Sequence, residues 1–176
     1  MRLCALVTTA LLFASPALAQ ERLERGTREL SLHISPDFEG AVGDMLQMHA
    51  GYGLFVRTGW EARATLGYAV FEDVAGEDSD YRTSELSLVG EYHFRRGSDL
   101  VPYAGFGAGW RKTEFAELEE SGAVFGPRGG LKYFLADNVV LDFEVTYKIG
   151  TADVFINDFE PDDTDISSMI GFRILF

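Results

Sequence analysis

His33 and Ser35 are the residues of this chain whose types and spacing come nearest to a catalytic pair. A single residue separates them, so on a β-strand both side chains would point to the same face. There His33 could act as the general base and Ser35 as the nucleophile of a hydrolase. A base and a nucleophile do not make an active site by themselves, and neither a Gly-x-Ser-x-Gly nor a His-Glu-x-x-His motif is present. We therefore predict no enzymatic activity and keep a hydrolase as an alternative.

A run of acidic residues near the C-terminus is the second group that could do chemistry. Its carboxylates would suit hard cations such as Ca²⁺ and Mg²⁺, which prefer oxygen ligands. The EF-hand spacing with its central glycine is absent, and acidic runs are usually solvated. We therefore predict no metal site and no cofactor. The acidic residues of this run are Asp158, Glu160, Asp162, Asp163 and Asp165.

Overall charge and cysteine content exclude several classes of function. The formal net charge is −13, which argues against nucleic acid as a partner because phosphate contacts need Lys and Arg. The single cysteine, Cys4, lies in an N-terminal apolar segment. If that segment is removed on export, a catalytic thiol, a disulfide and a zinc–cysteine site are all excluded.

The N-terminal segment has the features of a secretory signal peptide. Arg2 gives it a positive start, residues 3–13 form an apolar run, and residues 17–19, Ala-Leu-Ala, offer a small-x-small cleavage site before Gln20. The run is shorter than the roughly 20 residues that a membrane-spanning helix needs. A retained N-terminal anchor is the alternative. We predict a signal peptide at 1–19 and one domain at 20–176.

The rest of the chain alternates apolar and polar residues with a period of two. Within residues 139–149, for example, Phe143 and Val145 alternate with Asp142 and Glu144. Because successive side chains of a strand point to opposite faces, each such segment has one apolar and one polar face. Several have about the length of tilted membrane strands, and they predict an all-β fold, an eight-stranded antiparallel up-and-down transmembrane β-barrel. The segments are 28–35, 46–56, 61–71, 85–94, 100–110, 123–135, 139–149 and 166–176.

The connections between these segments alternate in length. Short turns rich in Gly, Asp and Asn are expected at 57–60, 95–99 and 136–138, and long loops at 36–45, 72–82, 111–121 and 151–165. Short turns at one end and long loops at the other are typical of outer-membrane barrels. The four long loops contain 18 acidic and three basic residues, a net charge of −15, so they hold the surplus negative charge of the chain.

Charges on the polar strand faces, by contrast, are nearly balanced in sign. An eight-stranded barrel leaves just enough room inside for side chains, and buried charges are retained mainly when they are paired. We predict an internal salt-bridge network that fills the lumen, with an open channel as the alternative. The predicted network consists of Arg63, Glu85, Glu91, Arg128, Lys132, Asp142, Glu144, Lys148 and Arg173.

Alternation alone does not say which face lies inside, because a soluble lipocalin-like barrel would reverse the two faces. Aromatic residues at both ends of the strands, and an aromatic residue at the end of the chain, favour lipid on the outside. In that arrangement Gly105, Gly107 and Gly109 face inward and leave room for charged side chains, while Phe106 and Trp110 face lipid.

Three stretches of the chain form recognisable motifs. Residues 102–109 read Pro-Tyr-Ala-Gly-Phe-Gly-Ala-Gly, residues 130–141 combine a glycine-containing strand, an Asp-Asn turn and a valine-rich strand, and residues 171–176 read Gly-Phe-Arg-Ile-Leu-Phe. Together they resemble the small outer-membrane β-barrel domain family, with its porin-like opacity proteins and OmpA- and OmpW-type barrels. The last stretch is similar to the family's C-terminal assembly signal, carried here by Gly171, Ile174 and Phe176. Met169 stands where the family favours a polar residue.

The resemblance implies a location and partners. It implies the cell outer membrane of a Gram-negative bacterium, contact with membrane lipid and lipopolysaccharide, recognition of the C-terminal strand by the barrel assembly machinery, and a monomer. The family has structural, adhesive and pore-forming members, so it does not define one function. We expect a non-enzymatic barrel whose acidic surface loops serve envelope integrity or surface interaction. The alternatives are a narrow porin-like channel for ions or small solutes and a lipid A-modifying hydrolase that uses His33 and Ser35.

Overall fold

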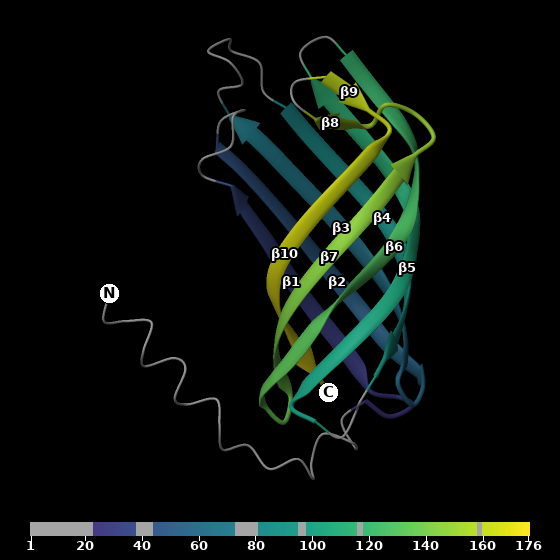
Figure 1. The fold of residues 1–176 in the computed structure, drawn as a ribbon, viewed down its shortest axis with the longest axis vertical. Helices are drawn as coiled ribbons and strands as arrows, with labels where there is room; N and C mark the ends of the chain where they lie inside the picture. Colours follow the sequence, from purple (N-terminus) through teal and green to yellow (C-terminus); the bar gives the residue numbers. More distant parts are fainter. Residues whose placement is uncertain (1–22, 38–43, 73–80, 95–97, 116–117, 158–159) are drawn as a thin grey trace, which may run out of the picture.

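The strands of this protein close into a barrel (Figure 1). The computed structural model describes residues 23–37, 44–72, 81–94, 98–115, 118–157 and 160–176. Eight strands form the barrel in the order β1-β10-β7-β6-β5-β4-β3-β2, and β8 and β9 form a separate two-stranded sheet. Among the described residues, no helix is long and apolar enough to cross a membrane. The strands are β1 (Arg28–Asp37), β2 (Asp44–Arg57), β3 (Trp60–Glu72), β4 (Tyr81–His93), β5 (Leu100–Phe115), β6 (Leu118–Ala136), β7 (Val139–Gly150), β8 (Phe155–Asn157), β9 (Glu160–Asp162) and β10 (Thr164–Leu175).

The first and last strands complete the barrel wall. β1 pairs with β10 in antiparallel register, with Leu32 opposite Phe172. At the end of the seam, Arg28 and Phe176 exchange two backbone hydrogen bonds of 2.9 and 3.0 Å. All neighbouring barrel strands are antiparallel. The predicted all-β, eight-stranded antiparallel barrel is confirmed, and the closed ladder leaves no long unpaired edge of the kind that hydrocarbon does not tolerate.

The two faces of the wall have the polarity predicted for a membrane barrel. Along β7, Asp142 and Glu144 are buried while Phe143 and Val145 are 48% and 40% exposed. Apolar residues thus cover the outside and charged residues the inside, the reverse of a soluble protein. Phe106 and Trp110 point outward as expected, 53% and 56% exposed.

Several predicted strand boundaries were wrong at the long-loop end. The loop predicted at 111–121 is largely strand, because β5 continues to Phe115 and β6 begins at Leu118. β4 begins at Tyr81, four residues before the predicted position. The loop predicted at 151–165 contains the β8–β9 hairpin. The predicted signal peptide and most of the loops at 36–45 and 72–82 lie outside the described residues.

Packed residues close both ends of the barrel. At the short-turn end Leu23, ahead of β1, is fully buried in an apolar cluster, and Gly59 in the β2–β3 turn donates a 2.9 Å backbone hydrogen bond to its carbonyl. The other members of this cluster are Phe55, Val101, Phe134, Val140 and Leu175.

At the long-loop end, beside β8 and β9 (Figure 1), Val154 and Phe155 pack against Val124. The Thr113 hydroxyl donates to the Val154 carbonyl at 2.7 Å, and the Arg111 guanidinium lies 4.7 Å from the centre of the Phe155 ring.

Candidate functional site: the charged lumen

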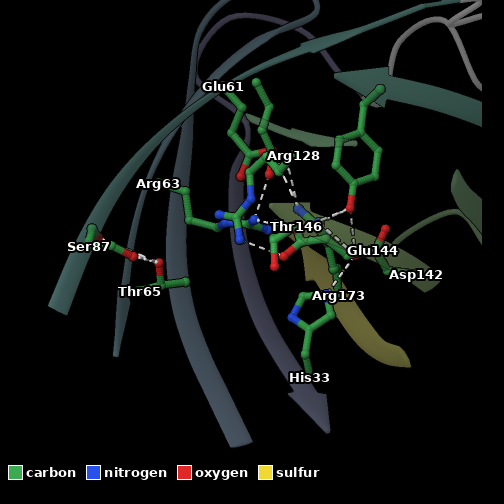
Figure 2. Close-up of polar contacts among 12 residues, drawn as sticks. His33, Glu61, Arg63, Thr65, Ser87, Arg128, Asp142, Glu144, Thr146 and Arg173 are labelled. Carbon is green, nitrogen blue, oxygen red and sulfur yellow. Dashed lines mark hydrogen bonds and ion pairs between the residues drawn. The ribbon is translucent and has the colours of Figure 1, made fainter. Parts of the chain in front are cut away.

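Most charged side chains of the lumen form one densely paired group, which we call the central network and part of which Figure 2 shows. Its members point inward because each lies on the polar face of its strand, two residues from the next inward side chain. Arg63 (β3), Glu91 (β4), Glu144 (β7) and Arg173 (β10) come from strands around the whole wall. The central network consists of Glu29, Glu61, Arg63, Glu91, Arg128, Lys132, Asp142, Glu144 and Arg173.

Arg173 is the most highly connected cation of the central network. Its Nη1 donates to Glu29 Oε1 at 2.8 Å and to Glu91 Oε2 at 3.2 Å. Its Nη2 and Nε donate to Asp142 Oδ2 at 2.6 and 2.9 Å, and Nη2 also reaches the Tyr103 hydroxyl at 2.9 Å. The planar guanidinium fork suits such multiple pairing with carboxylates. Arg173 is fully buried. Through these contacts its side chain links β10 to four other strands, β1, β4, β5 and β7.

Arg63 and Arg128 pair with carboxylates on neighbouring strands, and Arg63 also pairs across the lumen. Arg63 Nη2 donates to Glu91 Oε1 at 2.5 Å and, across the barrel, to Glu144 Oε2 at 3.0 Å. Arg128 Nη2 donates to Glu144 Oε1 at 2.6 Å. These contacts supply the close opposite charges that a buried ion needs to offset its lost hydration.

Lys132 on β6 lies between two carboxylates. Its Nζ donates to Glu29 Oε2 at 2.7 Å and to Glu61 Oε2 at 3.0 Å, and all three side chains are fully buried. The Lys132 ammonium also lies 5.6 Å from the ring centre of Phe55 and 5.6 Å from that of Tyr103, within cation–π range.

A second, smaller group lies toward the long-loop end. Lys148 Nζ donates to Glu85 Oε2 at 2.6 Å, and Arg111 Nη1 lies 3.6 Å from the same oxygen. Glu85 precedes Glu91 by six residues on β4, about 20 Å along the strand. All nine predicted lumen residues thus point inward and have ion-pair partners, but they fall into two groups.

The predicted network lacked four contributors to the lumen, and one of them is Glu61, which pairs with Lys132. Glu29 pairs with Lys132 and Arg173, and the Tyr103 hydroxyl donates to Asp142 and Glu144 at 3.2 and 3.1 Å. Arg111 had been assigned to a loop and instead points inward from β5. Glu29 shares the inward face of β1 with Ser31 and His33, and this spacing was the signal that could have identified it.

Glycines provide the space for two of these side chains. A Cβ at Gly105 would lie 3.0 Å from Glu91 Cγ, and one at Gly130 would lie 2.6 Å from the Tyr103 hydroxyl oxygen. The packing role predicted for Gly105 is therefore observed. Gly107 would meet Val89 rather than a charged residue, and Gly109 would meet Ser87.

The residues considered for catalysis are part of the same packing. His33 Nε2 lies 2.6 Å from Asp142 Oδ2, a buried hydrogen bond, while Ser35 is half-buried two residues further along β1. The lumen cavity beside Glu85, Thr146 and Lys148 has a volume of about 20 Å³, which is the space of about one water molecule. That volume holds no organic substrate.

Among the described residues, two clusters of His and carboxylate atoms are close enough together to hold a metal ion. They are His33–Asp142–Glu144 and Glu61–Glu91–His93, all buried. Their carboxylates are also partners of Arg63, Lys132 or Arg173. A divalent ion would have to compete with these cations, so neither cluster fits a resident metal well.

The residues of the C-terminal motif lie in the seam of the barrel. Gly171 is opposite His33, where a Cβ would lie 2.6 Å from the imidazole Cδ2 atom. Ile174 and Phe176 point outward, 48% and 59% exposed. These two side chains are accessible from the membrane side of the last strand.

Comparison with known proteins supports the same fold. The N-terminal barrel domain of OprF from Pseudomonas aeruginosa has a TM-score of 0.56, with 18% identity over 86% of this chain and 98% of that one. OprG of the same organism has a TM-score of 0.59, with 14% identity over 93% and 99% of the two chains. Ail, the attachment invasion locus protein of Yersinia pestis, has a TM-score of 0.54, with 17% identity over 86% and 99%. No curated protein matches the chain.

The family match covers nearly the whole sequence. The outer membrane protein beta-barrel domain matches residues 5–173, a span that includes seven strands of the barrel wall and most of β10. With its apolar outer face and its charged lumen, this chain belongs to the outer membrane protein beta-barrel domain family.

Proposed function

We propose that this chain is a non-enzymatic, non-conducting barrel of the outer membrane, whose acidic loops act at the cell surface in envelope integrity or surface interaction. The observation that carries the proposal is the filled lumen. Arg173 and Arg63 join carboxylates on opposite walls at 2.5 to 3.2 Å, so charged side chains span the lumen. Leu23 is buried in an apolar cluster at one end, and Phe155 is buried beside Arg111 at the other.

The electrostatic cost of opening the lumen supports a closed state. A permeating ion would have to separate buried pairs, and removing one partner of such a pair typically costs about 3–5 kcal/mol. The narrow porin-like channel remains the alternative, because the family that the sequence resembles includes pore-forming members. The hydrolase alternative has less support, because Asp142 holds His33 Nε2 within the central network.

The loops, rather than the lumen, are the surface on which we place the function. They carry 18 acidic residues against three basic ones, so they attract cationic groups and repel polyanions. Ail has been solved in complex with the heparin analogue sucrose octasulfate, a polyanion that these loops would disfavour. The partners we propose are lipopolysaccharide, with Mg²⁺ or Ca²⁺ bridging its anionic phosphates to the loop carboxylates, and surface molecules that carry cationic groups. The chain acts as a monomer inserted by the barrel assembly machinery through its C-terminal strand.

Conductance measurements test the closed lumen directly. The refolded protein in planar lipid bilayers is expected to give no steady unitary current steps, whereas a porin reconstituted in the same bilayers gives them. Steady steps that disappear when Lys148 or Arg128 is neutralised would establish the channel alternative. Membrane fractionation and a heat-modifiability gel on the same preparation show whether the barrel is folded and located in the outer membrane, so a silent bilayer is not mistaken for an unfolded protein.

A further inference from the structure

The β5–β6 hairpin continues beyond the end of β7 at the long-loop end of the barrel, the upper end in Figure 1. The β5–β6 ladder extends to Phe115 opposite Leu118 without a shift of register, whereas the last residue pair between β6 and β7 joins Val124 to Gly150. Among the described residues, no strand pairs with the other side of β6 between residues 118 and 123. This part of β6 therefore has an edge without a partner strand, on the side away from β5.

The hydrogen bonds of Ala123 show which backbone groups this edge presents. The Ala123 N–H donates to Thr151 Oγ1 at 3.0 Å, and its carbonyl accepts from the Thr151 N–H at 2.9 Å. Both groups of Ala123 thus point away from β5, and alternate residues of a strand point their backbone groups to the same side. Ser121 and Glu119 therefore do the same, while Glu120 turns its backbone toward β5. No described residue bonds to the backbone of Ser121 or Glu119 on this side. Glu119, Glu120 and Ser121 form what we call the open edge.

The open edge has the features of a site for strand addition. Its outward N–H and C=O groups are strong donors and acceptors, and an unpaired row of such groups is a template for another chain. Proteins commonly block exposed edges with proline, lysine or a bulge, and the open edge has none of these. All three residues are exposed, beyond the apolar wall of the barrel. An extended segment bound here would continue the wall in the position that β7 leaves.

Two glutamates determine which partner fits the open edge. Glu119 and Glu120 are neighbours in the sequence, so their carboxylates lie on opposite faces of the hairpin. Lys112 on β5 pairs with Glu119 at 2.9 Å, but the Glu119 side chain remains 67% exposed. A second copy of this chain would bring glutamates against glutamates, and like charges on facing strands are unfavourable. The complementary partner therefore has cationic side chains at two successive residues, one for each face.

We propose that the open edge binds an extended cationic peptide segment of a cell-surface partner, which adds to β6 as a further strand. The main chain of the segment bonds to the backbone of Glu119 and Ser121. Two successive Lys or Arg side chains contact the carboxylates of Glu119 and Glu120. The backbone bonds accept any extended chain, and the carboxylates select a cationic one. This inference rests on the proposed function, because it needs the long-loop end to face the outside of the cell, and it names one site and one partner class there.

A peptide probe tests the site on the unmodified protein. The probe has about ten residues, Thr and Val around a central Lys-Lys pair, and fluorescence anisotropy measures its binding to the barrel in nanodiscs of zwitterionic lipid. The same peptide with N-methyl groups on its backbone amides keeps the charge and loses the main-chain donors. It is expected to bind at least about tenfold more weakly. Equal binding of the two peptides would overturn the open edge and leave the function proposed for the acidic loops intact, because charge alone would then attract the peptide.

Ser121→Pro and Ser121→Ala are the matched variants. The Ser121 N–H points away from β5, so proline removes an outward donor without breaking a bond of the β5–β6 ladder, whereas alanine keeps that donor. The proline variant is expected to bind the probe about fivefold more weakly, and the alanine variant to bind it like the wild type. Both should keep the heat-modifiability of the wild type. Unchanged binding by Ser121→Pro would overturn the proposal, as would a wild type that does not bind the probe.

Two further measurements separate this inference from its alternatives. Self-association of the wild type in analytical ultracentrifugation that Ser121→Pro abolishes would overturn the proposal, because a second copy would then occupy the edge. Labelling of Ser121→Cys on intact cells with a membrane-impermeant maleimide tests the surface location by itself. Labelling is expected, and its absence would contradict the proposed function as well as the site.

Discussion

Lys112 and Lys132 each pair with two glutamates at similar distances, but Lys112 is exposed and Lys132 is buried. At the long-loop end, Lys112 Nζ lies 2.7 Å from Glu114 and 2.9 Å from Glu119. In the lumen, Lys132 Nζ lies 2.7 Å from Glu29 and 3.0 Å from Glu61. The Lys112 side chain is 40% exposed, whereas Lys132 is fully buried.

The difference in exposure changes what each contact does. Around Lys112, water screens the charges and solvates any that lose a partner, so such pairs contribute little to stability. Around Lys132, no water replaces a lost partner, and an uncompensated charge remains in a medium of low polarity. Equal distances therefore do not mean equal energies. The lumen pairs hold the barrel together, and the loop pairs mainly set the local charge.

The largest effect is expected from removing the centre of the lumen group. Arg173→Ala leaves Asp142, Glu29 and Glu91 without a shared cation, and it should destabilise the barrel by about 5 kcal/mol. The midpoint temperature of the heat-modifiability gel shift measures this loss. Arg57→Ala, at an exposed residue in the β2–β3 turn, serves as the control and should leave the midpoint unchanged. Equal behaviour of the two variants would contradict the structural role of the central network.

The two lysines themselves give the matched comparison. Lys132→Met keeps the length of the side chain and removes its charge, which should cost about 3 kcal/mol because Glu29 loses its closest partner. Lys112→Met makes the same change in water and should leave the unfolding midpoint unchanged. Comparable destabilisation by both variants would show that burial does not determine how much these ion pairs contribute to the stability of the barrel.

The smallest effect concerns titration rather than stability. Hydrogen bonds from Lys112 lower the pKa of Glu114, and hydrogen bonds to Glu114 and Glu119 raise the pKa of Lys112 to about 12. Because the pKa of Glu114 is lowered, the pair is fully formed at neutral pH and is lost as the pH falls through that pKa. In Lys112→Met the pKa of Glu114 should return toward its ordinary value, as measured by NMR titration of its carboxyl carbon. High salt should shift it in the same direction. A titration unaffected by either change would argue against the Lys112–Glu114 hydrogen bond in solution.

Sequence patterns predicted the strands accurately in the membrane-spanning part of the barrel and less accurately at the long-loop end. Between residues 139 and 149 the alternation is enforced by hydrocarbon on one side and packed charges on the other. From Arg111 to Glu114 the inward side chains, Arg111 and Thr113, are buried in polar contacts and the outward ones, Lys112 and Glu114, meet water. Polar residues therefore occupy both faces, and the period-two signal disappears. The β5–β6 hairpin nevertheless continues, with Glu114 opposite Glu119, because backbone hydrogen bonds do not depend on an apolar face. This is why the loop predicted at 111–121 was wrong.

The sequence predicted which charged residues belong to the candidate site, but not which of them form ion pairs with each other. Inward charged residues follow from the strand face on which they lie, and nine were identified in that way. Glu29 and Lys132 are 103 positions apart in the chain, and no local pattern connects them. Likewise, no local pattern connects His93 with Glu61.

Local alternation was thus enough to establish the fold class, the polarity of the two faces and the surplus of negative charge in the loops, since each depends on neighbouring residues along one strand. Pairing across the lumen and the seating of Leu23 and Phe155 at the two ends arise only when β1 meets β10 and the barrel closes. Closure brings side chains from opposite walls within about 3 Å, and at that range burial and geometry, rather than residue type, determine which charges are satisfied.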